Sequence, residues 1–203
     1  MPDLVTSEAE LEAIYGLPSG PAVIKEIDHI SAHYRRFIEA SPFVVLATAG
    51  PEGLDCTPRG DPPGFVRVVD SRTVMLPDRR GNNRIDTRRN IVRDPRIALL
   101  FLIPGEARTL RLNGRATISV NRELCESFTM EGKVPRSVIV VTAESVYTQC
   151  PKALVRSRLW DASLHVEESS LPSSGTIMKS LQQGFDAEAY DRNYPQRLRE
   201  TIY

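Results

Sequence analysis

The sequence predicts a mainly β fold of the α+β class, in which an antiparallel sheet closes fully or partly into a barrel between helices at the two ends of the chain. Short β-branched and apolar segments follow one another through the middle of the chain, mostly separated by tight turns of Gly, Pro and Asp. Strands and helices do not alternate regularly, as they would in a parallel sheet. A chain of 203 residues fits one domain. We therefore expect a single domain over residues 1–203, with a helical N-terminal arm over 1–40, the barrel over 43–148 and a C-terminal segment with helices over 149–203.

Two helices are expected in the N-terminal arm. Ser7 and Glu10 form an S-x-x-E capping box and Gly16 supplies a stop, so a short helix lies between them. Over residues 21–40, apolar residues recur at the spacing of one helix face. This spacing predicts one continuous amphipathic helix.

The barrel strands are predicted from apolar runs bounded by turns. They are expected at residues 43–49, 55–59, 65–69, 73–76, 97–103, 109–120 and 137–147. Two helices interrupt them. One runs from Asp86 to Asp94, where Pro95 follows, and the other is capped by Asn121 and extends to about Glu131. The first could instead be a parallel crossover, which the absence of further strand–helix units makes the less favoured alternative.

The C-terminal segment begins with CPKALVRSRLWD and continues through a loop of Ser, Pro and Gly. Two helical pieces follow at residues 176–183 and 186–199, and Pro195 disturbs the second. The only tryptophan, Trp160, lies among lysine and arginine residues. This cluster either packs a capped helix against the body or reaches a bound ligand.

The composition argues against several kinds of partner. With 26 basic and 26 acidic residues, no global field attracts the chain to nucleic acid or to an anionic membrane. No apolar run approaches the ~20 residues that span a bilayer. The first residues lack the basic and apolar regions of a signal peptide. Three cysteines without metal-ligand spacing indicate reduced thiols and no metal site, so we expect a cytoplasmic protein.

The stretch PDRRGNNRID, from Pro77 to Asp86, joins an apolar strand to a helix. A strand that enters a Gly and Asn loop and returns as a helix presents backbone N–H groups and a helix N-terminus at one place. Arginine and asparagine side chains surround that place, namely Arg79, Arg80, Asn82, Asn83 and Arg84. Such donors suit a phosphate, and Gly81 allows close approach. The same composition is typical of a polar turn, so both interpretations stay open on the loop alone.

Other recognisable chemistry is missing from the sequence. It holds no Gly-rich dinucleotide fingerprint, no phosphate loop and no G-x-S-x-G elbow. The RGD tripeptide at residues 59–61 matches an adhesion motif, which we attribute to chance in a chain without a secretion signal. An anion-binding loop on a β framework, with no obvious acid, base or nucleophile, suits a cofactor that brings its own chemistry.

Four blocks occur in order: FVVLATAGPEGLDCTPRGDPPGFV, VMLPDRRGNNRIDTRRNI, TLRLNGRATI and QCPKALVRSRLWD. Over residues 43–161 the chain resembles the pyridoxamine 5′-phosphate oxidase-like flavoproteins, in particular an uncharacterised FMN-dependent branch with PRGD and GNNR blocks. The resemblance implies a split β-barrel and a homodimer that binds FMN in two clefts between the subunits. The C-terminal block of genuine pyridoxamine phosphate oxidases is not matched, so vitamin B6 oxidation is not expected.

The resemblance also implies roles for residues near the phosphate. In relatives, the loop and helix start after the fourth strand hold the FMN phosphate, a role that falls here on Asn82, Asn83 and Arg84. Asp78 would line the strand end. Arg59 lies on a strand that approaches the phosphate or ribityl chain in relatives.

Further residues are implied nearer the flavin ring. Thr109 and Arg111 lie on the strand that precedes Gly114, where relatives contact the flavin. Lys152 and Arg158 lie in the C-terminal segment that relatives donate from the second subunit to the ring. A cation at the pyrimidine edge would favour the reduced, anionic ring, and either of these two residues is a candidate.

The leading functional hypothesis is an FMN-dependent oxidoreductase that acts on an unidentified small molecule, with no catalytic side chain assigned. Two alternatives use the same fold. One is a non-catalytic flavin- or haem-binding protein or sensor, and the other is a deazaflavin-dependent reductase.

Overall fold

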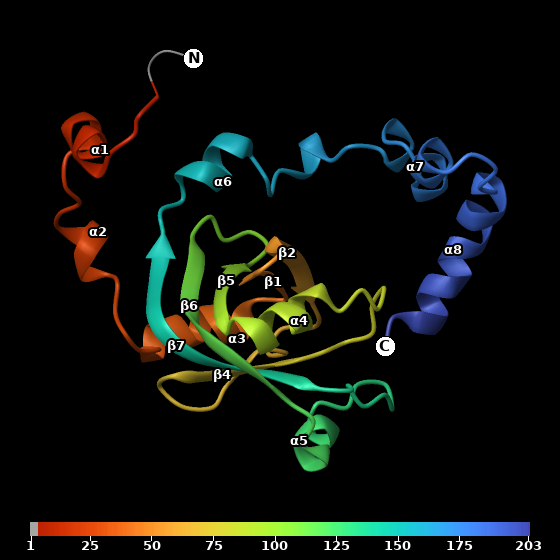
Figure 1. The fold of residues 1–203 in the computed structure, drawn as a ribbon, viewed down its shortest axis with the longest axis horizontal. Coiled ribbons are helices and arrows are strands. Elements are labelled where there is room, and N and C mark those ends of the chain that lie inside the picture. Colours follow the sequence, from red (N-terminus) through yellow and green to blue (C-terminus); the bar gives the residue numbers. More distant parts are fainter. Residues whose placement is uncertain (1–3) are drawn as a thin grey trace.

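The computed structural model describes residues 4–203. At its centre is a seven-stranded sheet in the order β2-β1-β5-β6-β7-β4-β3, which curls around a core as Figure 1 shows. The strands are β1 (Phe43–Gly50), β2 (Gly53–Gly60), β3 (Arg67–Val68), β4 (Thr73–Pro77), β5 (Arg96–Leu102), β6 (Thr109–Ser119) and β7 (Val138–Gln149). All neighbouring strands are antiparallel. The expected mainly β split barrel is confirmed. The helix between β4 and β5 is not a parallel crossover, because three successive antiparallel pairs separate these strands and they run in opposite directions.

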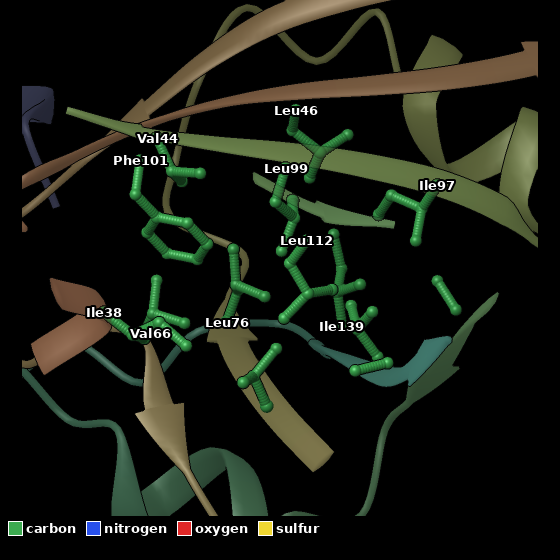
Figure 2. Close-up of a cluster of buried hydrophobic side chains, with 14 of the residues drawn as sticks. Ile38, Val44, Leu46, Val66, Leu76, Ile97, Leu99, Phe101, Leu112 and Ile139 are labelled. Atoms are coloured by element: carbon green, nitrogen blue, oxygen red, sulfur yellow. The ribbon is translucent and has the colours of Figure 1, made fainter. Parts of the chain in front are cut away.

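The alternation along the strands sends one side of the sheet into a shared core. Val44 and Leu46 of β1 meet Leu99 and Phe101 of β5 and Leu112 of β6 there, all of them buried (Figure 2). Burying one such side chain contributes about 1.5–3 kcal/mol to the stability of the folded state, relative to leaving it exposed to water. A register shift of one residue would turn this apolar set outward, so the core also determines the strand register.

The two longest strands, β6 and β7, are paired along most of their length, with one irregularity at Asn113 and Gly114. A Cβ atom at Gly114 would lie 2.0 Å from the carbonyl oxygen of Thr142. Only glycine therefore permits this close approach of the two backbones. Irregularities of this kind bend a strand and increase its twist, which helps the sheet to curl into a barrel.

The helix α4 (Asp86–Arg93) packs on β1. The buried Asn90 side chain donates from Nδ2 to Oγ1 of Thr48 at 3.1 Å. Gly50 leaves the room that Asn90 needs, because a Cβ atom there would meet Asn90 Oδ1 at 2.2 Å. These contacts hold the helix on the sheet, and they therefore also place its N-terminus.

The N-terminal arm comprises α1 (Glu8–Tyr15), α2 (Pro21–Ile24) and α3 (Ala32–Ala40). The short helix after Ser7 is confirmed, and Ser7 Oγ accepts the Glu10 N–H at 3.3 Å. The Glu10 carboxylate accepts from the backbone of Thr6 rather than from Ser7, so only half of the expected capping box forms.

The prediction of one helix over residues 21–40 is wrong. Ile27 forms a β-bridge with Val146 of β7, and its N–H donates to the Val146 carbonyl at 3.1 Å. The helix restarts only where Ser31 caps the N–H of Tyr34 at 3.2 Å. Pairing with a distant strand therefore prevails over the helical spacing of the apolar residues.

The remaining helices are α5 (Arg122–Ser127), α6 (Lys152–Ser157), α7 (Ser174–Leu181) and α8 (Ala187–Thr201), with 3₁₀ turns η1 (Ala162–Leu164) and η2 (Glu168–Ser170). The helix expected to reach Glu131 ends at Ser127, since a β-bridge between Met130 and Lys133 reverses the chain. Pro195 lies inside α8 without ending it.

Figure 1 shows α6, α7 and α8 as an arm that runs away from the barrel and returns to it at the end of α8. No helix within residues 4–203 combines the length and the apolar character needed to cross a bilayer.

Candidate functional site

A cleft of about 700 Å³ opens beside β2 and the N-terminus of α4. Its lining comes from well-separated parts of the chain: β2, the loop 78–85 with the start of α4, the turn 132–136 before β7, and Tyr203 beyond α8. In Figure 1 the end of the chain lies next to the loop that precedes α4. The loop that was singled out in the sequence therefore lines a cleft.

One face of β2 contributes to this cleft, where Asp55, Thr57 and Arg59 are half-buried and alternate with exposed residues. Thr87, in the first turn of α4, joins two of them. Its Oγ1 accepts from Arg59 Nη2 at 3.3 Å and donates to Asp55 Oδ2 at 2.7 Å. These two hydrogen bonds fix the position of the start of α4 relative to β2.

The side chain of Arg59 contains a buried hydrogen-bond donor that is not satisfied. Its Nε is buried and has no partner among the described residues. Burial lowers the pKa of the Arg59 guanidinium, an effect that the nearby Asp78 carboxylate opposes. Arginine nevertheless stays protonated in proteins. An anion in the cleft would supply the missing acceptor and offset the cost of burying the charge.

The loop before α4 has an unusual backbone. Asn83 and Ile85 have φ values of 61° and 59°. The left-handed conformation is costly for a β-branched residue such as Ile85, and such strain is concentrated at functional sites. The Arg84 N–H donates to Asn82 Oδ1 at 3.1 Å. Within residues 4–203 no side chain caps α4, so the N–H groups of its first turn are open to an anion.

Asp78, at the start of the loop, is buried. Its Oδ2 accepts from the guanidinium of Arg88, with Nε at 2.8 Å, and its backbone N–H donates to the Ser137 carbonyl at 2.9 Å. Its Oδ1 is buried without a hydrogen-bond partner in the described chain. Asp78 therefore orients Arg88 and leaves one acceptor for a hydroxyl or N–H group of a ligand.

Positive charge dominates the lining of the cleft. The cationic lining residues are Arg59, Arg79, Arg80, Arg84, Arg88, Lys133 and Arg136, against the carboxylates of Asp55, Asp78 and Asp86. Each of these carboxylates already accepts a hydrogen bond from a neighbour. Among the described lining residues there is no histidine. The cleft is thus suited to hold an anion and offers no ready general base.

The structure divides the residues implied by the resemblance into two groups. Those that line the cleft are Arg59, Asp78, Asn82, Asn83 and Arg84. Those that do not are Thr109, Arg111, Lys152 and Arg158. The second group clusters around the paired ends of β6 and β7.

Thr109 is buried and pairs with Gln149 at the end of β7, three residues before α6 begins. The Arg111 guanidinium lies over the ring of Tyr147, 5.1 Å from its centroid. On α6 and just beyond it, Lys152 and Arg158 are exposed. Of the four residues, Thr109 is thus inside the fold, Arg111 is half-buried, and Lys152 and Arg158 are at the surface.

The aromatic and cationic cluster around Trp160 is held by hydrogen bonds. The indole Nε1 donates to the Glu106 carbonyl at 2.9 Å. Arg158 Nε donates to Asp161 Oδ2 at 3.1 Å. Trp160 therefore attaches the segment after α6 to the β5–β6 turn, which supports the packing interpretation of this cluster.

Sequence reasoning missed several lining residues: Thr87, Arg88, Lys133, Arg136 and Tyr203. Two of them directly follow the loop, in the first turn of α4, and a helix start was a usable signal. The others come from a distant turn and from the end of α8. No local pattern connects them to the loop.

Comparison with known proteins gives a family and a set of structures. A family model described as pyridoxamine 5′-phosphate oxidase matches residues 30–150. The chain is similar to HupZ from Group A Streptococcus, with 19% identity, a TM-score of 0.48, and coverage of 59% of this chain and 93% of that one. It is also similar to a Clostridium acetobutylicum protein related to general stress protein 26 (pyridoxinephosphate oxidase family), with 18% identity, a TM-score of 0.45, and coverage of 58% of this chain and 85% of that one. An F420 reductase is similar with 17% identity, a TM-score of 0.43, and coverage of 58% of this chain and 98% of that one.

The curated proteins gave no significant match. The family model alone spans more than half of the 203 residues, including all the strands and α4. The chain belongs to the pyridoxamine 5′-phosphate oxidase family.

Proposed function

We propose that the protein is an FMN-dependent oxidoreductase that acts on a small molecule, with the FMN phosphate in the cleft beside α4. The observation that carries this proposal is the buried, unpartnered Nε of Arg59 beside the uncapped N-terminus of α4. The FMN phosphate is roughly dianionic near neutral pH, as other phosphate esters are. It matches both the cationic lining and the open N–H groups.

The residues of the cleft would share the work of binding. Arg59 and Arg84 would donate charged hydrogen bonds to the phosphate, and Asn82 and Asn83 neutral ones. Asp78 Oδ1 offers an acceptor for a ribityl hydroxyl. When bound, FMN supplies hydride or electron transfer, which agrees with a cleft lining that lacks a ready general base.

We further propose that the site is completed by a second copy of the chain. Thr109, Arg111, Lys152 and Arg158 lie outside the cleft of their own chain, and Lys152 and Arg158 are exposed on the surface of α6 and just beyond it. In a homodimer this surface of one copy would face the flavin in the cleft of the other. Of the two cation candidates, Arg158 is paired with Asp161, whereas Lys152 forms no ion pair in the described chain. We therefore assign Lys152 to the pyrimidine edge of the ring.

The arms also favour a second copy. Neither α1, α2, α6 nor α8 contains a buried residue, and large apolar side chains are exposed on them and on their neighbouring segments. They include Leu11, Ile14, Leu17, Ile24, Val155, Leu164, Leu171, Leu181 and Leu198. A shallow apolar pocket of about 340 Å³ on β1, β5 and β6, beside the 89% exposed Leu54, adds to this surface. A second copy of the chain would cover part of this apolar surface.

Colour and hydrodynamics test the proposal. Protein purified without added cofactor is expected to be yellow, to release FMN on denaturation and to sediment as a dimer. A colourless protein that gains no thermal stability from FMN would refute the cofactor. A stable monomer that retains flavin would refute the shared cleft. Bound FMN that no pyridine nucleotide or small-molecule substrate reduces or reoxidises would indicate a non-catalytic flavin-binding protein.

A further inference from the structure

The RGD tripeptide has a role inside the protein. Asp61 follows β2, and its side chain is 1% exposed, so it cannot serve as an adhesion motif in this conformation. Its carboxylate accepts two hydrogen bonds. Arg79 Nε donates to Oδ2 at 2.6 Å, and the Tyr203 hydroxyl donates to Oδ1 at 2.7 Å.

Arg79 belongs to the loop over residues 78–85 that lines the cleft, so its bond to Asp61 ties this loop to the end of β2. Arg79 directly follows Asp78, and it also donates from Nη1 to the Phe128 carbonyl at 2.7 Å. Its guanidinium lies 5.5 Å from the centroid of the Tyr203 ring, within range of a cation–π interaction. Tyr203 therefore contacts both Asp61 and Arg79, and this ion pair lies at the start of the loop over residues 78–85.

Tyr203 is also the point where the C-terminal arm meets the barrel. In the described chain, the hydrogen bond from Tyr203 to Asp61 connects the arm over residues 173–203 to the barrel. The other hydrogen bonds of α7, α8 and the residues after them join residues of the arm to one another. The two helices are instead attached to each other. Asp191 of α8 accepts from the Gly175 N–H at 2.8 Å, and Gly175 has no room for a Cβ atom beside Asp191 and the Ala187 carbonyl.

We propose that Tyr203 is a positioning residue of the anion cleft. Tyr203 forms part of the cleft wall, and its hydroxyl holds the Asp61–Arg79 pair at the start of the loop over residues 78–85. Docking of α8 and occupation of the cleft are then coupled, and each strengthens the other by the same factor. The identity of the ligand, FMN, rests on the proposed function.

A merely structural role for Tyr203 makes a different prediction. In that case its removal would loosen α8 and leave the cleft unchanged. The rate of FMN release and the effect of FMN on α8 distinguish the two roles.

The experiment compares the wild-type protein with Tyr203→Phe, Tyr203→Ala and, as the matched control, Tyr194→Phe on α8 of the same arm. Tyr203→Phe keeps the ring and removes only the hydroxyl. FMN release is followed by the recovery of flavin fluorescence. Hydrogen exchange of residues 187–203 is measured with and without FMN.

We expect Tyr203→Phe to release FMN roughly fivefold or more faster than wild type, the effect of losing about one hydrogen bond, and Tyr203→Ala faster still. FMN should slow hydrogen exchange in α8 of wild type and of Tyr194→Phe, but not in Tyr203→Phe. Unchanged release rates in both Tyr203 variants, or protection of α8 that FMN does not alter in wild type, would overturn the coupling and leave the proposed function standing. A wild-type protein that binds no FMN would overturn both.

Discussion

Replacing Arg59 with glutamine tests the anion site at the cation whose Nε is buried without a partner in the described chain. The wild-type side chain donates one hydrogen bond, to Thr87 at 3.3 Å, and leaves Nε without an acceptor. In the complex we propose, the phosphate becomes that acceptor. Losing a charged hydrogen bond costs about 1.5–3 kcal/mol. At about 1.4 kcal/mol per factor of ten, FMN should bind Arg59→Gln roughly 10- to 150-fold more weakly.

The same substitution should affect the cofactor-free protein little. It removes a charge whose burial is already unfavourable, as the direction of the Arg59 pKa shift shows. We therefore expect the free energy of unfolding without FMN to change by less than about 1 kcal/mol. The opposite pattern, a large loss of stability with little loss of affinity, would show that Arg59 serves the fold and not the ligand.

Calorimetry and flavin fluorescence would measure FMN affinity, and urea unfolding would measure stability. Arg122→Gln is the matched control, since Arg122 lies on α5 outside the cleft and its side chain is 89% exposed. Wild-type affinity in Arg59→Gln, or an equal loss in Arg122→Gln, would refute the reasoning.

Further predictions concern other parts of the molecule. Gly114→Ala should lower the free energy of unfolding by about 1–3 kcal/mol in urea titrations, because its Cβ atom would collide with the Thr142 carbonyl oxygen; no change would show that β6 and β7 separate freely there. Lys152→Gln should make the bound flavin harder to reduce in redox titrations with FMN affinity little changed, whereas an unaltered potential would exclude Lys152 from the ring. Hydrogen bonds from Arg108 lower the pKa of the Glu106 carboxyl from 4.5 to about 2. The hydrogen bonds from Arg108 to the Glu106 carboxylate should therefore be intact above pH 4.5 and weaken as the pH falls toward 2. Because Trp160 is bonded to the backbone carbonyl of Glu106, tryptophan fluorescence should report the loosening of this turn, a pH dependence that Glu106→Gln should lack.

The strands could be predicted from the sequence because each one carries its own signal. Alternating or continuous apolar residues with turns at both ends located β1, β5 and β6 to within about a residue of their observed bounds. The failures arose where a distant partner decides the structure. Ile27 leaves a helical pattern to pair with Val146, which no local feature of the N-terminal arm announces.

The same distinction holds for the cleft. Asn82, Asn83 and Arg84 are continuous in the sequence and could be found there. Lys133 and Tyr203 reach the cleft from remote segments through tertiary structure alone. The most informative sign of a ligand is that Arg59 Nε and Asp78 Oδ1 are buried without a hydrogen-bond partner in the described chain. Burial of an atom depends on the tertiary structure, so the sequence alone could not reveal this sign.

The wide separation of the cleft walls along the chain bears on how the protein folds. Contacts between residues far apart in sequence carry a large loop-closure entropy, and folds rich in them form slowly. Asp61 and Tyr203, 142 positions apart, can meet only after the barrel and the arm have both formed. The contact that joins the C-terminal arm to the cleft is therefore among the last to form. A ligand that binds the completed cleft would stabilise this last contact and, with it, the folded chain.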